Sequence, residues 1–302
     1  MSLFFGRNAD RCLRWLTAFA ALSIVFILVI LLGQIAYHGW ERVSWEFLTS
    51  PPEKGMTAGG IFPAIFGTAA LVILMTAFVA PFGVLAAVYF SEYADRASWA
   101  YKLARQAVNN LAGVPSVVFG LFGLGFFVQF VGKQIDRVAY GGALHYGQPA
   151  LIWAALTLAV LTLPVVIVSV EEALRAVPQS YREASYALGS TKSQAVFRVV
   201  LPHALPGVLT GAILAVSRAA GEVAPILFVG AAYYLPHLPS KLNDQFMELG
   251  YHIFILSTQS PDVDATKPLL YATVFVLLAL TFALNALAVL IRARMRVARR
   301  SV

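Results

Sequence analysis

Two oppositely charged residues lie four positions apart within a long apolar stretch of the sequence. Arg218 and Glu222 are the only charged residues in the stretch 199–240. A charged side chain at the centre of a bilayer costs roughly 2.5–3.5 kcal/mol on insertion scales, so such residues are seldom there without a role. Arginine stays protonated, and its planar fork of N–H donors matches an oxyanion. The pair therefore indicates either a charged group that lines a substrate path or a structural ion pair.

Small residues precede this pair at a regular spacing. They recur at every fourth position, and they are Gly207, Gly211, Ala215 and Ala219. Residues four apart lie on one face of an α-helix, and small residues at this spacing let a second helix approach closely in a membrane. We expect a span over residues 204–232 that packs tightly against another helix and carries Arg218 and Glu222 one turn apart on the same face.

A charged segment between two apolar stretches, residues 178–206, has the pattern of two short helices joined by a hinge. Ser180 and Glu183 have the spacing of a capping box, which predicts that a helix begins at Tyr181. Gly189 is placed to end this helix, because glycine adopts the left-handed conformation without steric cost.

The second half of this segment repeats the pattern. Thr191 and Gln194 again have capping-box spacing, so a second helix should run to about Val200 before Pro202 stops it. Two such helices are too polar to enter lipid and too small to fold alone. The segment therefore requires a partner surface.

The composition identifies the class of protein that carries these features. Of 302 residues, 59% are hydrophobic and only 12% are charged, which is far from the balance of a soluble domain. Six stretches can each hold the ~20 apolar residues that cross a bilayer. We therefore predict an all-α integral membrane protein, a single transmembrane domain over residues 1–302. The expected spans are residues 15–37, 61–90, 107–131, 150–170, 204–232 and 268–291.

The positions of the basic residues predict the orientation of the chain. With the amino terminus inside, 15 of the 22 lysines and arginines fall in cytoplasmic segments and six in outer segments, while Arg218 lies within the membrane. Basic residues accumulate on the cytoplasmic side. Both termini and the loop of residues 171–203 are thus expected in the cytoplasm. The basic residues lie at span ends without an aromatic-interleaved patch, so nucleic-acid binding is not expected.

Several kinds of chemistry find no support in the sequence. The five histidines have no metal-ligand spacing, and no Gly-x4-Gly-Lys-Ser/Thr motif occurs. We also find no nucleophile set, so we expect no catalytic residues, no metal and no ATP bound by this chain itself. Cys12 is the only cysteine, which excludes a disulfide within the chain.

The hinged segment resembles the EAA motif of ABC importer permeases, the cytoplasmic loop that docks on the ATPase subunit. The match extends over about twenty residues at fixed offsets. The matching residues implied to dock are Glu183, Ala184, Gly189, Leu201 and Pro202. Ser185 replaces the second alanine of the motif and Val199 replaces its isoleucine, and both exchanges are mild.

Longer segments sharpen the resemblance. Residues 110–120, 177–189 and 218–225 are similar to permease subunits of the high-affinity phosphate ABC importer, and the run 243–254 favours its A-type subunit. The similarity covers nearly all the chain from about residue 60 onward. One departure is Val223, where the family often has threonine, so any hydroxyl contact from that position is absent.

The resemblance implies a fold, a location and partners. It implies the type I ABC importer permease fold with a cytoplasmic coupling-helix loop, in a bacterial inner membrane. The implied partners are a C-type permease subunit in a heterodimer, two ATP-binding cassette subunits, a periplasmic phosphate-binding protein and membrane lipid. ATP and magnesium would be bound by the partner ATPase. Arg218 would hold the anion, and Glu222 would assist it.

Two alternatives remain open from the sequence. The substrate of such an importer could be another oxyanion, such as molybdate or sulfate, because the binding protein sets much of the selectivity. Alternatively, Arg218 and Glu222 could form the relay of a proton-coupled secondary transporter. Copurification with an ATP-binding subunit would separate this class from an ABC importer.

Overall fold

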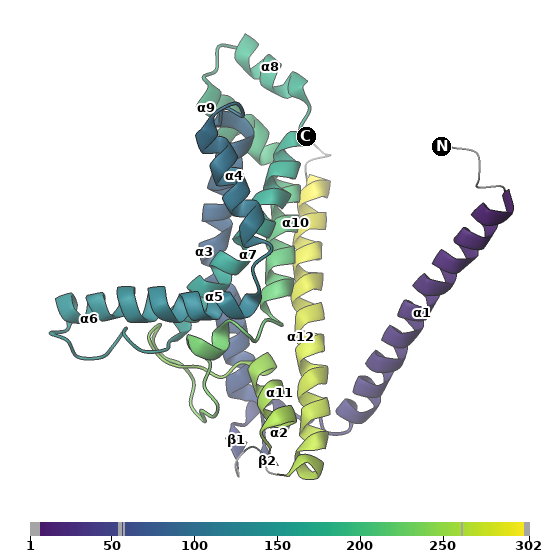
Figure 1. Ribbon diagram of the computed structural model, residues 1–302, viewed down its shortest axis with the longest axis vertical. Helices are drawn as coiled ribbons and strands as arrows, with labels where there is room; N and C mark the ends of the chain where they lie inside the picture. Colours follow the sequence, from purple (N-terminus) through teal and green to yellow (C-terminus); the bar gives the residue numbers. More distant parts are fainter. Residues whose placement is uncertain (1–6, 54–55, 57, 261, 299–302) are drawn as a thin grey trace.

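The computed structural model describes residues 7–53, 56, 58–260 and 262–298 (Figure 1). Lys54, Arg299 and Arg300, which the charge count includes, lie outside these described residues. Apart from a two-stranded antiparallel sheet, the regular structure described is helical. The label η marks the π-helices η2, η3 and η4 and the 3-10 helix η5. The elements are α1 Arg7–Trp40, α2 Trp45–Thr49, β1 Pro52–Glu53, β2 Ala58–Gly59, α3 Phe62–Val88, η2 Tyr89–Tyr93, α4 Trp99–Leu111, α5 Ser116–Phe122, η3 Gly123–Gly132, α6 Lys133–Ala139, α7 Leu151–Arg175, α8 Gln179–Ala187, α9 Lys192–Ala195, η4 Val196–Val200, α10 Leu201–Ala219, η5 Ile226–Phe228, α11 Leu249–Thr258 and α12 Val263–Ala298.

Six helical segments in the described part are long and apolar enough to cross a membrane, which confirms the predicted fold class. A helix satisfies all its backbone polar groups internally, and this is what a span requires in lipid. The segments are Ala9–Trp40, Phe62–Tyr93, Ser116–Ala139, Leu151–Arg175, Lys192–Ala219 and Val263–Arg294. Four of the six cover the predicted spans closely, and the third and fifth differ.

The third predicted span, residues 107–131, was wrong in its bounds. α4 ends at Leu111, and Pro115 directly precedes α5. Proline lacks an amide and disfavours a helical conformation of the residue before it, and residues 112–115 separate α4 from α5. α4 is a separate amphipathic helix, and the span is Ser116–Ala139.

The core centres on α7, the most buried of the six segments. α3 and α10 pack against it, and a large apolar cluster that includes Leu158 and Ile167 fills the contacts. A second cluster, which includes Leu249 and Met247, joins α11 to α12 and to the start of α3. α1 has no buried residue in its apolar window and lies apart from the bundle except near its contact with α12 (Figure 1).

The small residues of α10 contact α7, as the sequence predicts. A Cβ added at Gly207 would lie 2.3 Å from Ala173 Cβ, and one added at Gly211 would lie 2.9 Å from Ser169 Cβ. Ala215 and Ala219 are buried on the same helix. These short distances confirm that the stripe allows the two helices to approach closely.

We expect Gly207→Ala to lower stability, because neither β-carbon can move aside without a shift of its backbone. Overpacking of this kind costs about 1–3 kcal/mol. Gly221→Ala is the matched control, since a Cβ there meets nothing within 4 Å. Thermal unfolding of both purified variants in detergent provides the measurement. Equal midpoints for the two variants would contradict the close packing of α7 and α10.

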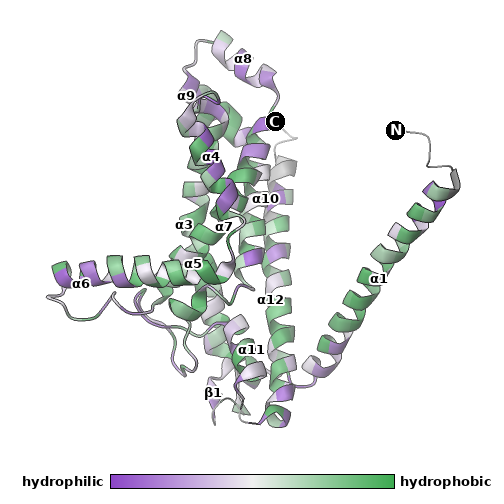
Figure 2. Cartoon of the chain, in the orientation of Figure 1, coloured by the Kyte–Doolittle hydropathy of each residue, from purple (hydrophilic) through white to green (hydrophobic). Residues whose placement is uncertain are grey.

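One end of the molecule is markedly hydrophilic. Figure 2 shows polar residues gathered on α8 and α9, whereas long apolar faces run along α1, α3 and α12. The start of α1 and the end of α12 lie toward this same end, and α2, α11 and the small sheet lie toward the other (Figure 1).

Candidate functional site

The predicted pairing of Arg218 with Glu222 is confirmed. Arg218 lies in the last turn of α10, and its Nε donates to Oε1 of Glu222 over 3.2 Å. The Arg218 side chain is 44% exposed and that of Glu222 is 22% exposed. A cation near the carboxyl end of a helix is also favoured by the helix dipole.

The prediction that both residues occupy one helix was wrong. α10 ends at Ala219, and Glu222 lies in the turn that follows, so the predicted bounds 204–232 extend too far. Pro225 lacks the amide that a continuing helix would use and disfavours a helical conformation of the residue before it. Glu222 therefore reaches Arg218 from a turn and not from the next turn of the helix.

This geometry leaves most of the Arg218 guanidinium free to bind an anion. Among the described residues, only its Nε has a partner, and both terminal nitrogens remain unbonded. An exposed cation within a span cannot face hydrocarbon without a large cost. The exposed side of Arg218 must therefore meet water or another protein surface, and it can offer paired N–H donors to an oxyanion there.

A buried carboxylate lies close to this turn. Glu248 is 2% exposed and accepts hydrogen bonds from the amides of Gly250 and Tyr251. Gly250 lies between it and Val223, since a Cβ at Gly250 would be 2.8 Å from Val223 Cγ2 and 3.1 Å from a Glu248 carboxylate oxygen. Burial raises the pKa of Glu248 to about 7, although the hydrogen bonds that its carboxylate accepts from the two amides oppose this shift. The capped start of α11 therefore lies close to Val223, the residue after Glu222.

A buried histidine follows one turn later on α11. His252 is 2% exposed, and its Nδ1 has no hydrogen-bond partner among the described residues. Burial lowers the pKa of His252 to about 4, because the charged form would lose its hydration. The side chain is therefore neutral near pH 7.

We expect Glu248→Gln to change the pH dependence of stability. The pKa of Glu248 is raised on folding, so its contribution is complete below about pH 4.5 and is lost as the pH rises through about 7. The contribution of His252 to stability changes with pH in the opposite direction, because its pKa is lowered on folding. This contribution is the same in the wild type and the variant, so it cancels in their difference. Between about pH 4.5 and pH 7, the free energy of unfolding of the wild type should fall by about 3 kcal/mol relative to that of the variant.

Thermal unfolding in detergent at pH 5 and pH 8 measures this difference. The matched control is Glu46→Gln, which removes an exposed carboxylate from α2. A wild type and a Glu248→Gln variant that lose stability in parallel would show that Glu248 does not titrate in this range.

The hinge of the polar segment has the predicted conformation. Gly189 adopts φ +82°, and its amide bonds to the carbonyl of Tyr186. Thr191 and Gln194 form the predicted capping box at the start of α9, with both reciprocal hydrogen bonds present. Left-handed backbone is costly for residues with a side chain, so glycine is required at this turn.

Two helix boundaries in this segment were predicted wrongly. α8 begins at Gln179, not Tyr181, because Pro178 takes the N-cap position and Ser180 makes no capping bond. Pro202 does not end the second helix either. The Leu201 amide bonds to the carbonyl of Val196, five residues earlier, so η4 is a π-helical turn. Such a turn shifts the hydrogen-bond register of the helix. The proline then falls in the first turn of α10, where no amide is needed.

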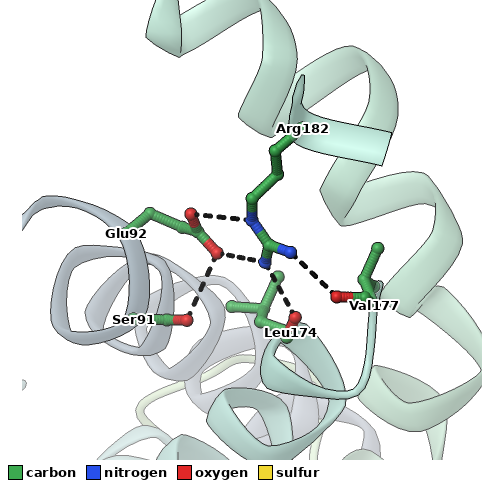
Figure 3. A network of polar contacts seen from close by, with 5 residues as sticks. All are labelled: Ser91, Glu92, Leu174, Val177 and Arg182. Carbon is green, nitrogen blue, oxygen red and sulfur yellow. Dashed lines mark hydrogen bonds and ion pairs between the residues drawn. The ribbon is translucent and has the colours of Figure 1, made fainter. Parts of the chain in front are cut away.

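A buried ion pair holds α8 on the bundle (Figure 3). Arg182 of α8 donates to Glu92 of η2 over 2.7 Å, and it also bonds to the carbonyls of Leu174 and Val177 at the end of α7. The two side chains are only 11% and 8% exposed. Arg182 thus bonds to one carbonyl in the last turn of α7 and to one in the short connection after it, and it joins α8, η2 and α7 at one point.

The predicted docking residues fall into two groups. Glu183, Ala184 and Gly189 are exposed, whereas Leu201 and Pro202 are half-buried at the start of α10. A groove of ≈ 480 Å³ between α8 and α9 is lined in part by Ala184 and Gly189. Leu188 also lines this groove and is 90% exposed, an unusual position for a large apolar side chain unless a partner covers it.

Three functional candidates were missed by the sequence reasoning. Glu248 directly precedes the apolar run of α11, and an acidic side chain at the start of a helix is a recognisable signal. Glu92 follows a long apolar stretch, but only the structure shows that its side chain is buried and paired. His252 has no comparable signal, because nothing in its neighbouring residues predicts its burial.

Comparisons with known proteins agree on one family. The family described as binding-protein-dependent transport system inner membrane component matches residues 79–297. The probable ABC transporter permease protein YqgI of Bacillus subtilis is 32% identical over 270 residues, 85% of this chain and 86% of that protein. The phosphate transport system permease protein PstA 1 of Mycobacterium tuberculosis is 36% identical over 205 residues, 66% of this chain and 62% of that protein.

A solved structure extends the agreement to the fold. A chain of a bacterial alginate ABC transporter, solved with an alginate pentasaccharide-bound periplasmic protein, aligns with a TM-score of 0.64. The alignment covers 94% of this chain and 95% of that one at 15% identity. The chain therefore has the fold of an ABC importer permease.

Proposed function

Because this chain belongs to the binding-protein-dependent transport system inner membrane components, we propose that it is the transmembrane permease subunit of an ATP-driven importer of inorganic phosphate. The matching relatives include a phosphate transport system permease, which supports phosphate as the substrate. The observation that carries the proposal is the docking segment, in which exposed α8 is held on the bundle by Arg182. A separate ATPase bound there can transmit its motion to α3 and α7.

The pair of Arg218 and Glu222 is proposed to line the substrate path. Its free guanidinium nitrogens supply donors for a phosphate anion. Arg218 is the last residue but one of its span, and its exposed face must meet water or a second protein surface there. We assign this surface to a related C-type permease, so that the path lies between two subunits.

The other partners follow from the same arrangement. Two ATP-binding cassette subunits would dock on the loops of the two permeases, and Glu183, Ala184, Gly189, Leu201 and Pro202 are the proposed contacts in this chain. A periplasmic phosphate-binding protein would deliver the anion to the opposite end. ATP and magnesium belong to the ATPase subunits in this proposal, and this chain supplies no catalytic residue.

We predict that both termini and the docking loop lie in the cytoplasm. The charge distribution favours this orientation. Reporter fusions at residues 92 and 190 should indicate a cytoplasmic location, and fusions at residues 50 and 250 a periplasmic one. A periplasmic signal at residue 190 would contradict the docking proposal as well, because ATP is inside the cell.

The function can be tested in cells that lack this chain. Deletion should abolish high-affinity uptake of labelled phosphate, and the affinity-tagged chain should restore it and copurify with an ATP-binding subunit. Normal phosphate uptake in the deletion strain, or a transport-competent chain that purifies without an ATPase, would contradict the proposal.

A further inference from the structure

A basic pocket lies beneath the docking helix, separate from the groove that the docking residues line. It has a volume of ≈ 460 Å³, and its walls come from η2 and the loop after it, the end of α7, α8 and the start of α9. The cations that line it are Arg96, Arg175, Arg182 and Lys192. One carboxylate, that of Glu92, faces them.

The charges in this pocket do not cancel. Glu92 is engaged by Arg182, and Arg175 pairs with Glu171, which also binds Arg105. Two lining cations are left without a carboxylate partner among the described residues.

These two cations differ in their surroundings. Lys192 lies over the ring of Tyr93, with its Nζ 5.1 Å from the ring centroid. The exposed Arg96 side chain forms no hydrogen bond or ion pair with any described residue. Its chain neighbour Asp95 does not line the pocket and instead accepts a bond from the amide of Ala97.

The start of α8 adds to the positive potential. Pro178 and Gln179 line the pocket, and no side chain caps the first turn of this helix. Uncapped amides and the helix dipole favour an anion at such a position. Basic pockets at the cytoplasmic ends of membrane helices are suited to phosphate-bearing groups.

We propose that this pocket binds a phosphate group, either free inorganic phosphate or the headgroup of an anionic phospholipid. An occupant would connect η2, α7, α8 and α9 and so hold the docking helix on the bundle. The site is distinct from Arg218, which lies roughly 40 Å from Lys192 along the helical segment that contains both. Its occupancy can therefore be measured independently of transport.

Hydrogen exchange of the assembled transporter in lipid nanodiscs tests this proposal. One arm adds inorganic phosphate to discs of phosphatidylcholine, and the other titrates phosphatidylglycerol into the discs. We expect slower exchange of the amides in residues 176–186 in one arm. Protection by phosphate alone identifies the free anion, and protection by phosphatidylglycerol alone identifies the lipid headgroup.

Charge-removing variants make the test specific. Arg96→Gln with Lys192→Gln should raise the concentration of the effective probe at half-saturation roughly 30-fold. The control pair, Lys102→Gln with Arg294→Gln, removes two exposed charges that do not line the pocket and should leave it unchanged. If the double variant does not assemble, Arg96→Gln alone should give a roughly fivefold shift.

Three results would overturn the proposal. The first is the absence of protection in both arms. The second is equal protection of the wild type and the pocket variant. The third is an equal loss in the pocket and control variants, which would indicate a response to overall charge only.

Discussion

Replacing Arg218 by alanine should abolish phosphate uptake while the transporter remains assembled. The Arg218–Glu222 pair is substantially exposed, and exposed pairs contribute at most about 1 kcal/mol to stability. The loss of a charged hydrogen-bond donor costs about 1.5–3 kcal/mol, which corresponds to roughly 10- to 150-fold weaker anion binding. Glu222 would then repel the anion without an opposing charge.

Three further variants separate a substrate role from a structural one. Arg218→Lys should restore uptake only in part, because an ammonium lacks the planar fork of donors. Glu222→Gln should impair uptake less than Arg218→Ala does. A purely structural pair predicts that either single change lowers the amount of complex and that exchanging the two residues restores it. Labelled-phosphate uptake and complex abundance are measured together, and normal uptake by Arg218→Ala would exclude the path role.

Replacing Arg182 by methionine should uncouple ATP hydrolysis from uptake. Methionine replaces the aliphatic stem of the arginine side chain but leaves the buried Glu92 carboxylate without a charged partner, with only the Ser91 hydroxyl bonded to it. Removal of one member of a buried pair costs about 3–5 kcal/mol. α8 would then lose its hydrogen bonds to η2 and to the carbonyls of Leu174 and Val177. We expect ATP hydrolysis by the complex to continue while phosphate transported per ATP falls severalfold.

The double variant Arg182→Met with Glu92→Gln is the matched control. It removes the unpaired charge, so any destabilisation of the single variant should be relieved, whereas coupling should not recover, because the contact from α8 to η2 remains broken. Wild-type coupling in the Arg182→Met transporter would show that this ion pair does not transmit the motion of the ATPase.

The features that the sequence predicted well depend on local physical rules. An apolar stretch long enough to span a bilayer, the Thr191–Gln194 capping box and the left-handed Gly189 each follow from a few neighbouring residues. The small stripe that begins at Gly207 also follows from spacing alone. The Arg218–Glu222 pair was found because charge is costly in a span.

The errors arose where a tertiary contact or a change of hydrogen-bond register decided the outcome. Pro202 was expected to break a helix, but the π-helical turn of η4 places it where no amide is required. α8 starts at Gln179 because Pro178 takes its N-cap position, and Arg182 bonds back to the connection between α7 and α8. The burial of Glu248 depends on how α11 packs against α3 and α12. No periodicity in the sequence specifies that packing.

The most direct test of the account is ATP hydrolysis by the purified transporter in proteoliposomes. The complex is supplied with its binding protein loaded with phosphate, sulfate or molybdate, and accumulation of the labelled anion is followed in parallel. We predict that phosphate stimulates hydrolysis and accumulates in the compartment that contains ATP, whereas the other two anions do neither. Stimulation by sulfate or molybdate without a response to phosphate would contradict the proposed substrate, and phosphate uptake without ATP hydrolysis would contradict the proposed mechanism.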